Sequence, residues 1–308
     1  MARYLVTGGA GFIGSHLCAR LVADGHDVRA LDDLSSGHRS NLDGVDVDLI
    51  VGDLRDSDAL GSAVEGADFV LHHAAIASVQ YSVEHPLEEQ DVNVVGTLQV
   101  LEAARAAGVR RVVFAASAAA YGADEKVPKQ ETMPTVPISP YGLSKVAGEH
   151  YCRGWSHVYE LETGCLRYFN IFGPRQDPAS PYSGVISIFA RAMIDGRTPT
   201  IHGDGEQSRD FTFVDNVVAA NMLACAMPST AGEIYNIGCA RAITVNELVA
   251  ALNTCLGSEL KPDHIESRAG DVRVSLADIS AASQQLGYEP TTAFEEGLRQ
   301  TVDWMRAS

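Results

Sequence analysis

The sequence predicts an α/β fold with a doubly wound, mainly parallel sheet and a smaller, interleaved α/β lobe toward the C-terminus. The first half of the chain alternates short β-branched runs with longer amphipathic segments, as successive βαβ units do. A glycine-rich turn follows the first of these runs directly. With 308 residues, of which 46% are hydrophobic and 20% charged, the chain can bury a large core.

In the first half we expect strands at 4–7, 27–31, 49–52, 69–72 and 111–114, and helices at 13–24, 58–65 and 91–107. A further helix should open at Pro140-Tyr141 and run to about residue 159, before a strand at 165–168. In such sheets ligands bind beyond the carboxyl ends of the strands, so the functional residues should gather there.

The second half changes in texture at a Pro-, Ser- and Gly-rich segment, 173–184, which predicts a long loop. Helices are expected at 185–195, 215–226, 244–256 and 293–305, and a buried strand at 233–237 should rejoin the sheet. We therefore predict one domain of residues 1–170 plus about 207–240, and a smaller lobe of about 171–206 plus 241–308.

Composition excludes several classes of protein. The net charge is −17 and no dense Lys/Arg cluster occurs, which argues against nucleic-acid binding. No apolar stretch approaches a membrane span, and the first residues read as a strand and not as a signal peptide. The six cysteines contain no Cys-x-x-Cys motif, so we expect buried thiols in a reducing cytoplasm and no metal site.

The segment TGGAGFIG (7–14) follows a predicted strand and opens a predicted helix. Its glycines at 8, 11 and 14 would let the backbone approach a pyrophosphate resting on the helix N-terminus. Asp32, at the end of the second strand, should accept hydrogen bonds from a ribose, which predicts NAD and not NADP. Asp53 and Leu54 end the third strand, where an adenine could lie, although a helix cap is an equally good interpretation of Asp53.

Tyr141 and Lys145 lie four residues apart on the predicted helix and therefore on one face. An ammonium beside a phenol favours the phenolate, so this tyrosine could act as a base. Alone, the pair would more often be part of a solvated helix face. The dinucleotide loop in the same chain favours the catalytic interpretation.

Together these residues resemble the extended short-chain dehydrogenase/reductases, and most of all the UDP-hexose 4-epimerases of the UDP-glucose and UDP-N-acetylglucosamine branch. The resemblance covers nearly the whole chain and implies a Rossmann domain, NAD, a UDP-sugar substrate and a homodimer formed by helices at about 93–107 and 141–159. It is carried by TGGAGFIGSHL (7–17), LDDLSSG (31–37), HHAA (72–75), NVVGT (93–97), SAAAYG (117–122), SPYGLSK (139–145), RYFNIFGPRQDP (167–178), GDGEQSRDF (203–211) and RAGD (268–271).

The resemblance also implies the roles of individual residues. The catalytic positions would be Ser117, Tyr141 and Lys145. The cofactor positions would be Gly8, Gly11, Phe12, Ile13, Asp32, Asp33, Ser36, Gly37, Asp53, Leu54, Ala74, Ala75, Asn93, Tyr141, Lys145 and Tyr168. The substrate positions would be Ser117, Asn170, Val185, Ile201, Arg209, Arg268, Asp271 and Ser275. For Arg209 and Arg268 the alternative is a salt bridge with the neighbouring Asp210 or Asp271.

Two departures from the family pattern bear on the retention of NAD, and a further pair of alanines bears on the reaction. Ala115-Ala116 replace serines common in relatives, and Ala77 stands where some epimerases carry lysine; either could weaken retention of NAD. Ala118-Ala119 occupy the places where a 4,6-dehydratase carries its Asp-Glu pair, which favours epimerisation through a 4-keto sugar. A UDP-glucuronate 4-epimerase and a non-catalytic NAD sensor remain alternatives.

Substrate breadth should depend on Ser275, which the resemblance places against the C2 substituent of the sugar. A tyrosine there would leave room only for a hydroxyl, whereas serine leaves room for an N-acetyl group. The resemblance therefore implies that UDP-GlcNAc and UDP-GalNAc interconvert as well as UDP-Glc and UDP-Gal.

Overall fold

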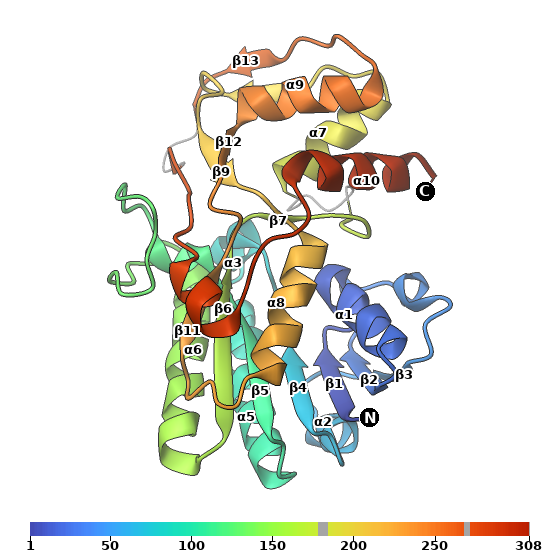
Figure 1. Cartoon of the computed structure of the whole chain (residues 1–308), viewed down its shortest axis with the longest axis vertical. Coiled ribbons are helices and arrows are strands. Elements are labelled where there is room, and N and C mark those ends of the chain that lie inside the picture. Colours follow the sequence, from blue (N-terminus) through green and yellow to red (C-terminus); the bar gives the residue numbers. More distant parts are fainter. Residues whose placement is uncertain (178–183, 268–271, 308) are drawn as a thin grey trace.

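The structure is a computed structural model that describes residues 1–177, 184–267 and 272–307. Its centre is a seven-stranded sheet (Figure 1) in the order β3-β2-β1-β4-β5-β6-β11, in which every neighbouring pair is parallel. The doubly wound sheet is thus confirmed, and the strand predicted at 233–237 does rejoin it beside β6. The strands are β1 (Arg3–Thr7), β2 (Asp27–Asp32), β3 (Asp48–Val51), β4 (Phe69–His72), β5 (Arg111–Ser117), β6 (Glu162–Tyr168) and β11 (Ile234–Ile237).

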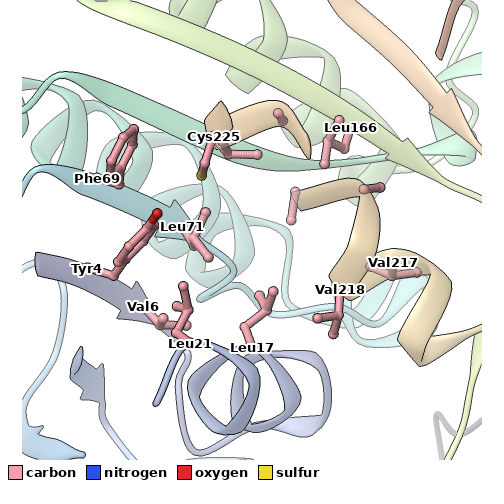
Figure 2. Packing of buried hydrophobic residues seen from close by; sticks show 14 of the residues in the cluster. Tyr4, Val6, Leu17, Leu21, Phe69, Leu71, Leu166, Val217, Val218 and Cys225 are labelled. Atoms are coloured by element: carbon pink, nitrogen blue, oxygen red, sulfur yellow. The ribbon is translucent and has the colours of Figure 1, made fainter. Parts of the chain in front are cut away.

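Helices cover both faces of this sheet because successive strand residues point to opposite sides. Val6 and Leu71 pack against α1 (Phe12–Ala23) and α8 (Val214–Ala226), as Figure 2 shows. Leu5 and Val70 pack on the other side, against α2 (Ser57–Val64), α5 (Gly96–Ala106) and α6 (Pro140–Tyr159). Both faces are therefore apolar, and polar side chains that function must lie at the strand ends.

The helix predicted at 91–107 differs from the structure at its start. Residues Asp91–Val95 form a π-helical turn, η2, and α5 begins only at Gly96. Two short helices that were not predicted precede it, α3 (Val79–Glu84) and α4 (Pro86–Gln90), the second with Pro86 in its first turn. Such short helices carry too few apolar repeats to be seen in sequence periodicity, whereas π turns are frequent at functional sites.

The upper lobe in Figure 1 has its own core around α7 (Val185–Ile194), α9 (Val245–Leu256) and α10 (Phe294–Ala307). Phe172 packs edge-on against Phe213 and Phe294, with ring centroids 5.6 and 5.8 Å away. Short strand pairs complete the lobe and its junction with the sheet: β7 (Ile171–Phe172) with β10 (Thr212–Phe213), β8 (Thr200–His202) with β13 (Asp263–Ile265), and β9 (Ser208–Asp210) with β12 (Ala242–Thr244).

Single turns occur at η1 (Arg39–Leu42), η3 (Ala118–Tyr121) and η4 (Ala282–Leu286). Within the three described ranges, every helix is too short or too polar to span a bilayer.

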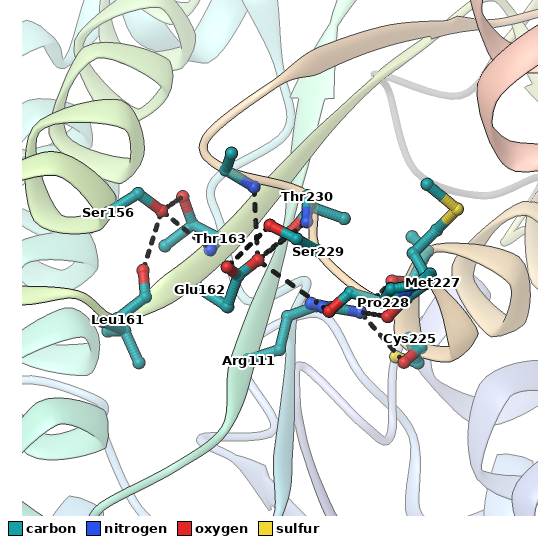
Figure 3. Close-up of polar contacts among 12 residues, drawn as sticks. Arg111, Ser156, Leu161, Glu162, Thr163, Cys225, Met227, Pro228, Ser229 and Thr230 are labelled. Atoms are coloured by element: carbon teal, nitrogen blue, oxygen red, sulfur yellow. Dashed lines mark hydrogen bonds and ion pairs between the residues drawn. The ribbon is translucent and has the colours of Figure 1, made fainter.

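At the amino ends of the strands, a buried ionic cluster ties the sheet to α8 (Figure 3). Arg111, the first residue of β5, donates to the carbonyl oxygens of Ala224 and Met227, each at 2.8 Å, at the C-terminus of α8. Glu162, the first residue of β6, accepts from the backbone N–H of Thr230 at 2.7 Å and lies 3.5 Å from Arg111 Nη2. A cation at a helix C-terminus complements the helix dipole, so Arg111 stabilises the end of α8. Arg111 and Glu162 are thus paired with other groups of the chain at this end of the sheet.

Candidate active site

The residues predicted to function gather at the opposite, carboxyl edge of the sheet. Asp32 ends β2, Ser117 ends β5 and Tyr168 ends β6. Ser117 and Tyr168 are register partners on neighbouring strands. Tyr141 lies in the first turn of α6, which contacts both η3 after Ser117 and the strand β5. The topology therefore brings motifs that are far apart in sequence to one edge.

The glycine loop forms a cradle that only glycine can build. Gly8 has a positive φ of 69°, and a Cβ placed there would lie 2.8 Å from the backbone nitrogen of Ala74. A Cβ on Gly14 would lie 2.0 Å from the carbonyl oxygen of Gly8. Helix α1 begins after Gly11 without a side-chain cap and without an acidic residue in its first turn. An uncapped helix N-terminus at a close backbone approach fits the pyrophosphate of a dinucleotide.

Asp32 is held firmly beside this loop. Its carboxylate accepts hydrogen bonds from the backbone N–H of Ala10 at 2.9 Å and of Leu34 at 2.8 Å. A Cβ on Gly37 would come within 2.8 Å of Asp32 Oδ1, so the next loop packs directly on the carboxylate. Burial raises the pKa of Asp32, and the backbone donors oppose that rise. The neighbouring Asp33 and Ser36 are exposed on the same loop.

Asp53 lies in an ionic group at the rim of the site. Arg55 donates to both oxygens of Asp53 and, at 2.5 Å, to Asp91. This hydrogen bonding lowers the pKa of the Asp53 carboxyl. The N-cap of α2 is Asp56, so the interpretation of Asp53 as that helix's cap is wrong. Leu54 is buried, and a Cβ on Gly96 would clash with its side chain.

Asn93 fixes the segment that follows β4. Its side-chain amide exchanges two hydrogen bonds with the backbone of Ile76, at 2.8 and 3.0 Å. The backbone N–H of Ala74 meets the Thr7 hydroxyl at 3.2 Å. Ala74 and Ala75 are thereby held next to the glycine loop, and their small side chains leave the strand ends open to a ligand.

The Tyr141–Lys145 pair is present, with Lys145 Nζ 5.8 Å from the centre of the Tyr141 ring. Lys145 is buried and donates to the carbonyl oxygen of Ala115 at 2.9 Å. Burial lowers the pKa of Lys145 to about 8, although Glu89 and Glu149 act in the opposite direction.

The pKa of Tyr141 does not follow the sequence-based expectation. Burial raises it, a side-chain interaction with Ser117 lowers it, and Glu89 raises it again. The protein alone thus favours the phenol, because loss of solvation is the largest influence on the Tyr141 hydroxyl. A phenolate at neutral pH needs further positive charge in the site.

A polar chain that the sequence did not reveal lies beside Tyr168. The Tyr168 hydroxyl contacts His73 Nε2 at 2.9 Å and accepts from the Asn221 amide at 2.8 Å. Burial lowers the pKa of His73 to about 3, so its ring is neutral. In the described part of the chain, the buried atoms His73 Nδ1 and Arg175 Nη1 have no hydrogen-bond partner. Only the pair of histidines in HHAA could have drawn attention to His73.

The predicted substrate residues are divided between the sheet edge and the lobe. Asn170 follows β6 with a positive φ of 35°, and Val185 opens α7. Arg209 donates to the carbonyl oxygen of Val272 at 2.6 Å, and Ser275 is held by a backbone bond to Ser208 at 3.0 Å.

The surroundings of Ile201 and Asp210 differ from those expected. The side chain of Ile201 is 1% exposed within the lobe core, so only its backbone could reach a ligand. The Asp210 carboxylate accepts hydrogen bonds from the backbone N–H groups of Cys239 and Ala277. These contacts do not support the alternative in which Asp210 is the ion-pair partner of Arg209. Arg268 and Asp271 lie outside the described residues.

Over the described ranges, no group of three or more His, Cys, Asp or Glu side chains could hold a metal ion. The parallel sheet, the glycine cradle and the Tyr-Lys pair define a Rossmann-fold enzyme of the extended short-chain dehydrogenase/reductase class. Residues 4–238 match the NAD dependent epimerase/dehydratase family. The chain belongs to this family, and NAD is its cofactor.

Individual proteins agree with this placement. A UDP-glucose 4-epimerase of Mycolicibacterium smegmatis is 42% identical over 99% of this chain and 98% of its own length. The structure resembles that of the Thermotoga maritima UDP-glucose 4-epimerase with UDP-glucose, at a TM-score of 0.94 and 39% identity over 99% of both chains. It also resembles the UDP-N-acetylglucosamine 4-epimerase of Methanobrevibacter ruminantium in complex with UDP-N-acetylmuramic acid, at a TM-score of 0.95 and 37% identity over 99% and 98% of the two chains. The protein is a nucleotide-sugar epimerase.

Proposed function

We propose that the protein is a UDP-hexose 4-epimerase that interconverts UDP-Glc with UDP-Gal and UDP-GlcNAc with UDP-GalNAc. The observation that carries this proposal is that the residues for oxidation meet at one edge of the sheet, while the two positions after Ser117 carry no acid or base for dehydration. Ser117, Tyr141 and Lys145 meet at the carboxyl edge of the sheet, whereas Ala118 and Ala119 follow Ser117 and cannot move protons. Oxidation and re-reduction at C4 are then the chemistry available.

Each catalytic residue has one task in this reaction. Tyr141 removes the proton of the sugar 4-hydroxyl, and Ser117 holds that oxygen in line with the tyrosine. Bound NAD would supply the hydride acceptor at C4 and, in its oxidised ring, a positive charge. Lys145, whose Nζ lies 5.8 Å from the centre of the Tyr141 ring, adds a second positive charge that favours the phenolate. Tyr141 then returns a proton after the 4-keto sugar has turned over.

The two parts of the chain divide the binding task in this proposal. The Rossmann domain, residues 1–170 plus about 207–240, would hold NAD through the glycine cradle and Asp32. The lobe of about 171–206 plus 241–308 would anchor the UDP moiety through Asn170, Val185, the backbone of Ile201 and Arg209, with Arg268 and Asp271. Arginine suits a diphosphate because its planar fork pairs with phosphate oxygens.

Breadth toward N-acetylated sugars rests on Ser275. This residue is small, and its backbone N–H donates to the carbonyl oxygen of Ser208 in β9, the residue before Arg209. The test is to supply UDP-glucose, UDP-GlcNAc and UDP-glucuronate separately, without added cofactor, and to resolve the products. Conversion of both neutral hexoses supports the proposal, while turnover of UDP-glucuronate alone would replace it with the uronate alternative.

Changing Ser275→Tyr sharpens this test. The larger side chain should reduce kcat/KM for UDP-GlcNAc about 100-fold or more, since a steric clash with the acetyl group has no ready relief, while UDP-glucose turnover stays within a few-fold. Ser280→Tyr, at an exposed position five residues later, is the matched control and should change neither. Unchanged activity of Ser275→Tyr on UDP-GlcNAc would contradict the steric account.

We also propose that the enzyme is a cytoplasmic homodimer formed through α5 and α6. Exposed apolar side chains accumulate on α6 and the neighbouring α3 and α4, where they would be covered by a second copy. They are Val79, Val83, Leu87, Leu143 and Val158. All six cysteines are free thiols, which fits a reducing compartment. A monomer mass by sedimentation at micromolar concentration would refute the dimer.

A further inference from the structure

Glu89 is a completely buried carboxylate to which the sequence motifs assign no role. It lies in α4 and is 0% exposed. One carboxylate oxygen accepts two hydrogen bonds, one from Ser144 Oγ at 2.6 Å and one from the Asn93 amide. The second oxygen accepts from the Gln90 amide at 2.7 Å. Both amide contacts use Glu89 as an acceptor, as suits a carboxylate.

These partners connect Glu89 to both halves of the site. Ser144 immediately precedes Lys145 on α6, and its hydroxyl also lies 2.9 Å from the carbonyl oxygen of Tyr141. Asn93 holds the backbone of Ile76 beside the glycine loop. A single side chain therefore links the catalytic helix to the segment that faces the cofactor.

The charge of Glu89 is not balanced by its own partners. In the described structure these are a hydroxyl and two amides, all neutral. Glu149, the other carboxylate near Lys145, is held instead by two hydrogen bonds of 2.7 Å from Arg167. A buried charge requires compensation, so the anion at Glu89 needs a cation that its hydrogen bonds do not supply.

The geometry points to Lys145 as that cation, because it is buried, it directly follows Ser144 on α6, and α6 packs against α4, which carries Glu89. Burial lowers its pKa to about 8, and Glu89 is the largest of the charges that oppose this shift. The other groups around it are neutral, aromatic or already paired: the Ala115 carbonyl and Phe114 on β5, the two neutral histidines His72 and His73 at the end of β4, and Tyr141, Cys152 and the Arg167-bound Glu149 on α6.

We propose that Glu89 is a positioning residue that keeps Lys145 protonated beside Tyr141 and fixes the catalytic helix to the Asn93 segment. The proposal rests on the role of Lys145 in the proposed epimerase, but it concerns the charge of Lys145 and can be tested without turnover.

The decisive test uses the small number of lysines. The chain has four, so lysine labelled with 13C at Cε gives few NMR signals, and the loss of one in Lys145→Met assigns Lys145. In Glu89→Gln the pKa of Lys145 should fall by about one unit, because a nearby buried anion is lost. Glu89→Asp should restore most of it, and Ser144→Ala, which removes the hydrogen bond but not the charge, should change it little. Lys126 and Lys261 are exposed references.

An unchanged Lys145 titration in folded Glu89→Gln would overturn the proposal, as would an equal shift in Ser144→Ala. If Glu89→Gln does not fold, Glu89→Met supplies a second neutral variant with the same expected shift and the same contrary outcome. In the active holoenzyme, the alkaline limb of the kcat–pH profile should move to lower pH by the same amount, with KM nearly constant. A Lys145 shift in a protein without epimerase activity would retain this inference and reject the proposed function.

Discussion

Strands β5 and β6 carry polar residues at both ends, but the surroundings of these residues differ between the two ends. At their amino ends Arg111 and Glu162 are held by backbone carbonyl and amide groups of α8 and the loop after it (Figure 3). At their carboxyl ends Ser117 and Tyr168 lie among groups that the described chain leaves unsatisfied, such as His73 Nδ1. At the amino ends one buried atom in the described chain, Arg111 Nε, also has no hydrogen-bond partner. The strands are the same, so the difference comes from what the loops at each end provide.

The amino ends of these two strands therefore contribute mainly to stability, and their carboxyl ends to function. Satisfied buried charges contribute to the fold, whereas unsatisfied or desolvated ones cost stability and are retained where a ligand completes them. Burial lowers the pKa of Lys145 to about 8, which corresponds to a free-energy cost of burying its charge. Variants at the two ends should therefore change different quantities.

The largest effect is expected at the carboxyl end. Tyr141→Phe removes the group that takes the 4-hydroxyl proton, so kcat should fall about 1,000-fold or more while folding and bound NAD are retained. Rates are measured by product analysis on UDP-glucose. The matched control is Tyr235→Phe, a buried tyrosine of β11 whose hydroxyl meets Gln285 at 3.2 Å, and its kcat should be unchanged. An active Tyr141→Phe enzyme would reject the base and favour an NAD-binding sensor.

At the amino end the effect should fall on stability. Arg111→Met leaves Glu162 and the C-terminal carbonyls of α8 without their buried cation, so the free energy of unfolding should drop by about 3–5 kcal/mol. Urea denaturation measures this, and kcat of the remaining folded enzyme should stay near the wild-type value. Arg105→Met, which breaks an exposed pair with Glu102, should change stability little. Equal losses in both variants would remove the distinction between the buried cluster and a surface pair.

The smallest effect on stability, and one of opposite sign, is expected when Lys145 is removed together with its buried counter-charge, in the double variant Lys145→Met/Glu89→Gln. The native pKa of about 8 lies below the ordinary value of 10.5, so between these values the unfolded chain binds more protons than the native chain. The penalty is complete below pH 8 and disappears above about pH 10.5. The double variant should thus be inactive yet more stable by about 1–3 kcal/mol at pH 7, with the gain decreasing up to about pH 10.5. Denaturation at the two pH values checks this, and a loss of stability at pH 7 would contradict it.

The sequence predicted the sheet well because its strands are continuous apolar runs and its first turn must be glycine. Gly8 and Gly14 show why: any side chain there meets backbone atoms within 3 Å. It failed at α3, α4 and η2, where short turns carry no periodicity. Glu89 was missed for the same reason, since a glutamate in a polar helix looks exposed until the fold buries it against Ser144.

What the sequence determined alone was local: the order of strands and helices, the glycine turn, the acid after β2 and the Tyr141–Lys145 spacing. The tertiary structure alone decided the charge states, because these depend on burial and on partners distant in the chain. Lys145 is one turn from Tyr141 in any helix, but only the packing of α6 on the sheet and of α4 on α6 removes water from both and brings a carboxylate near them. Desolvation is a property of the assembled fold, and no spacing of residues encodes it.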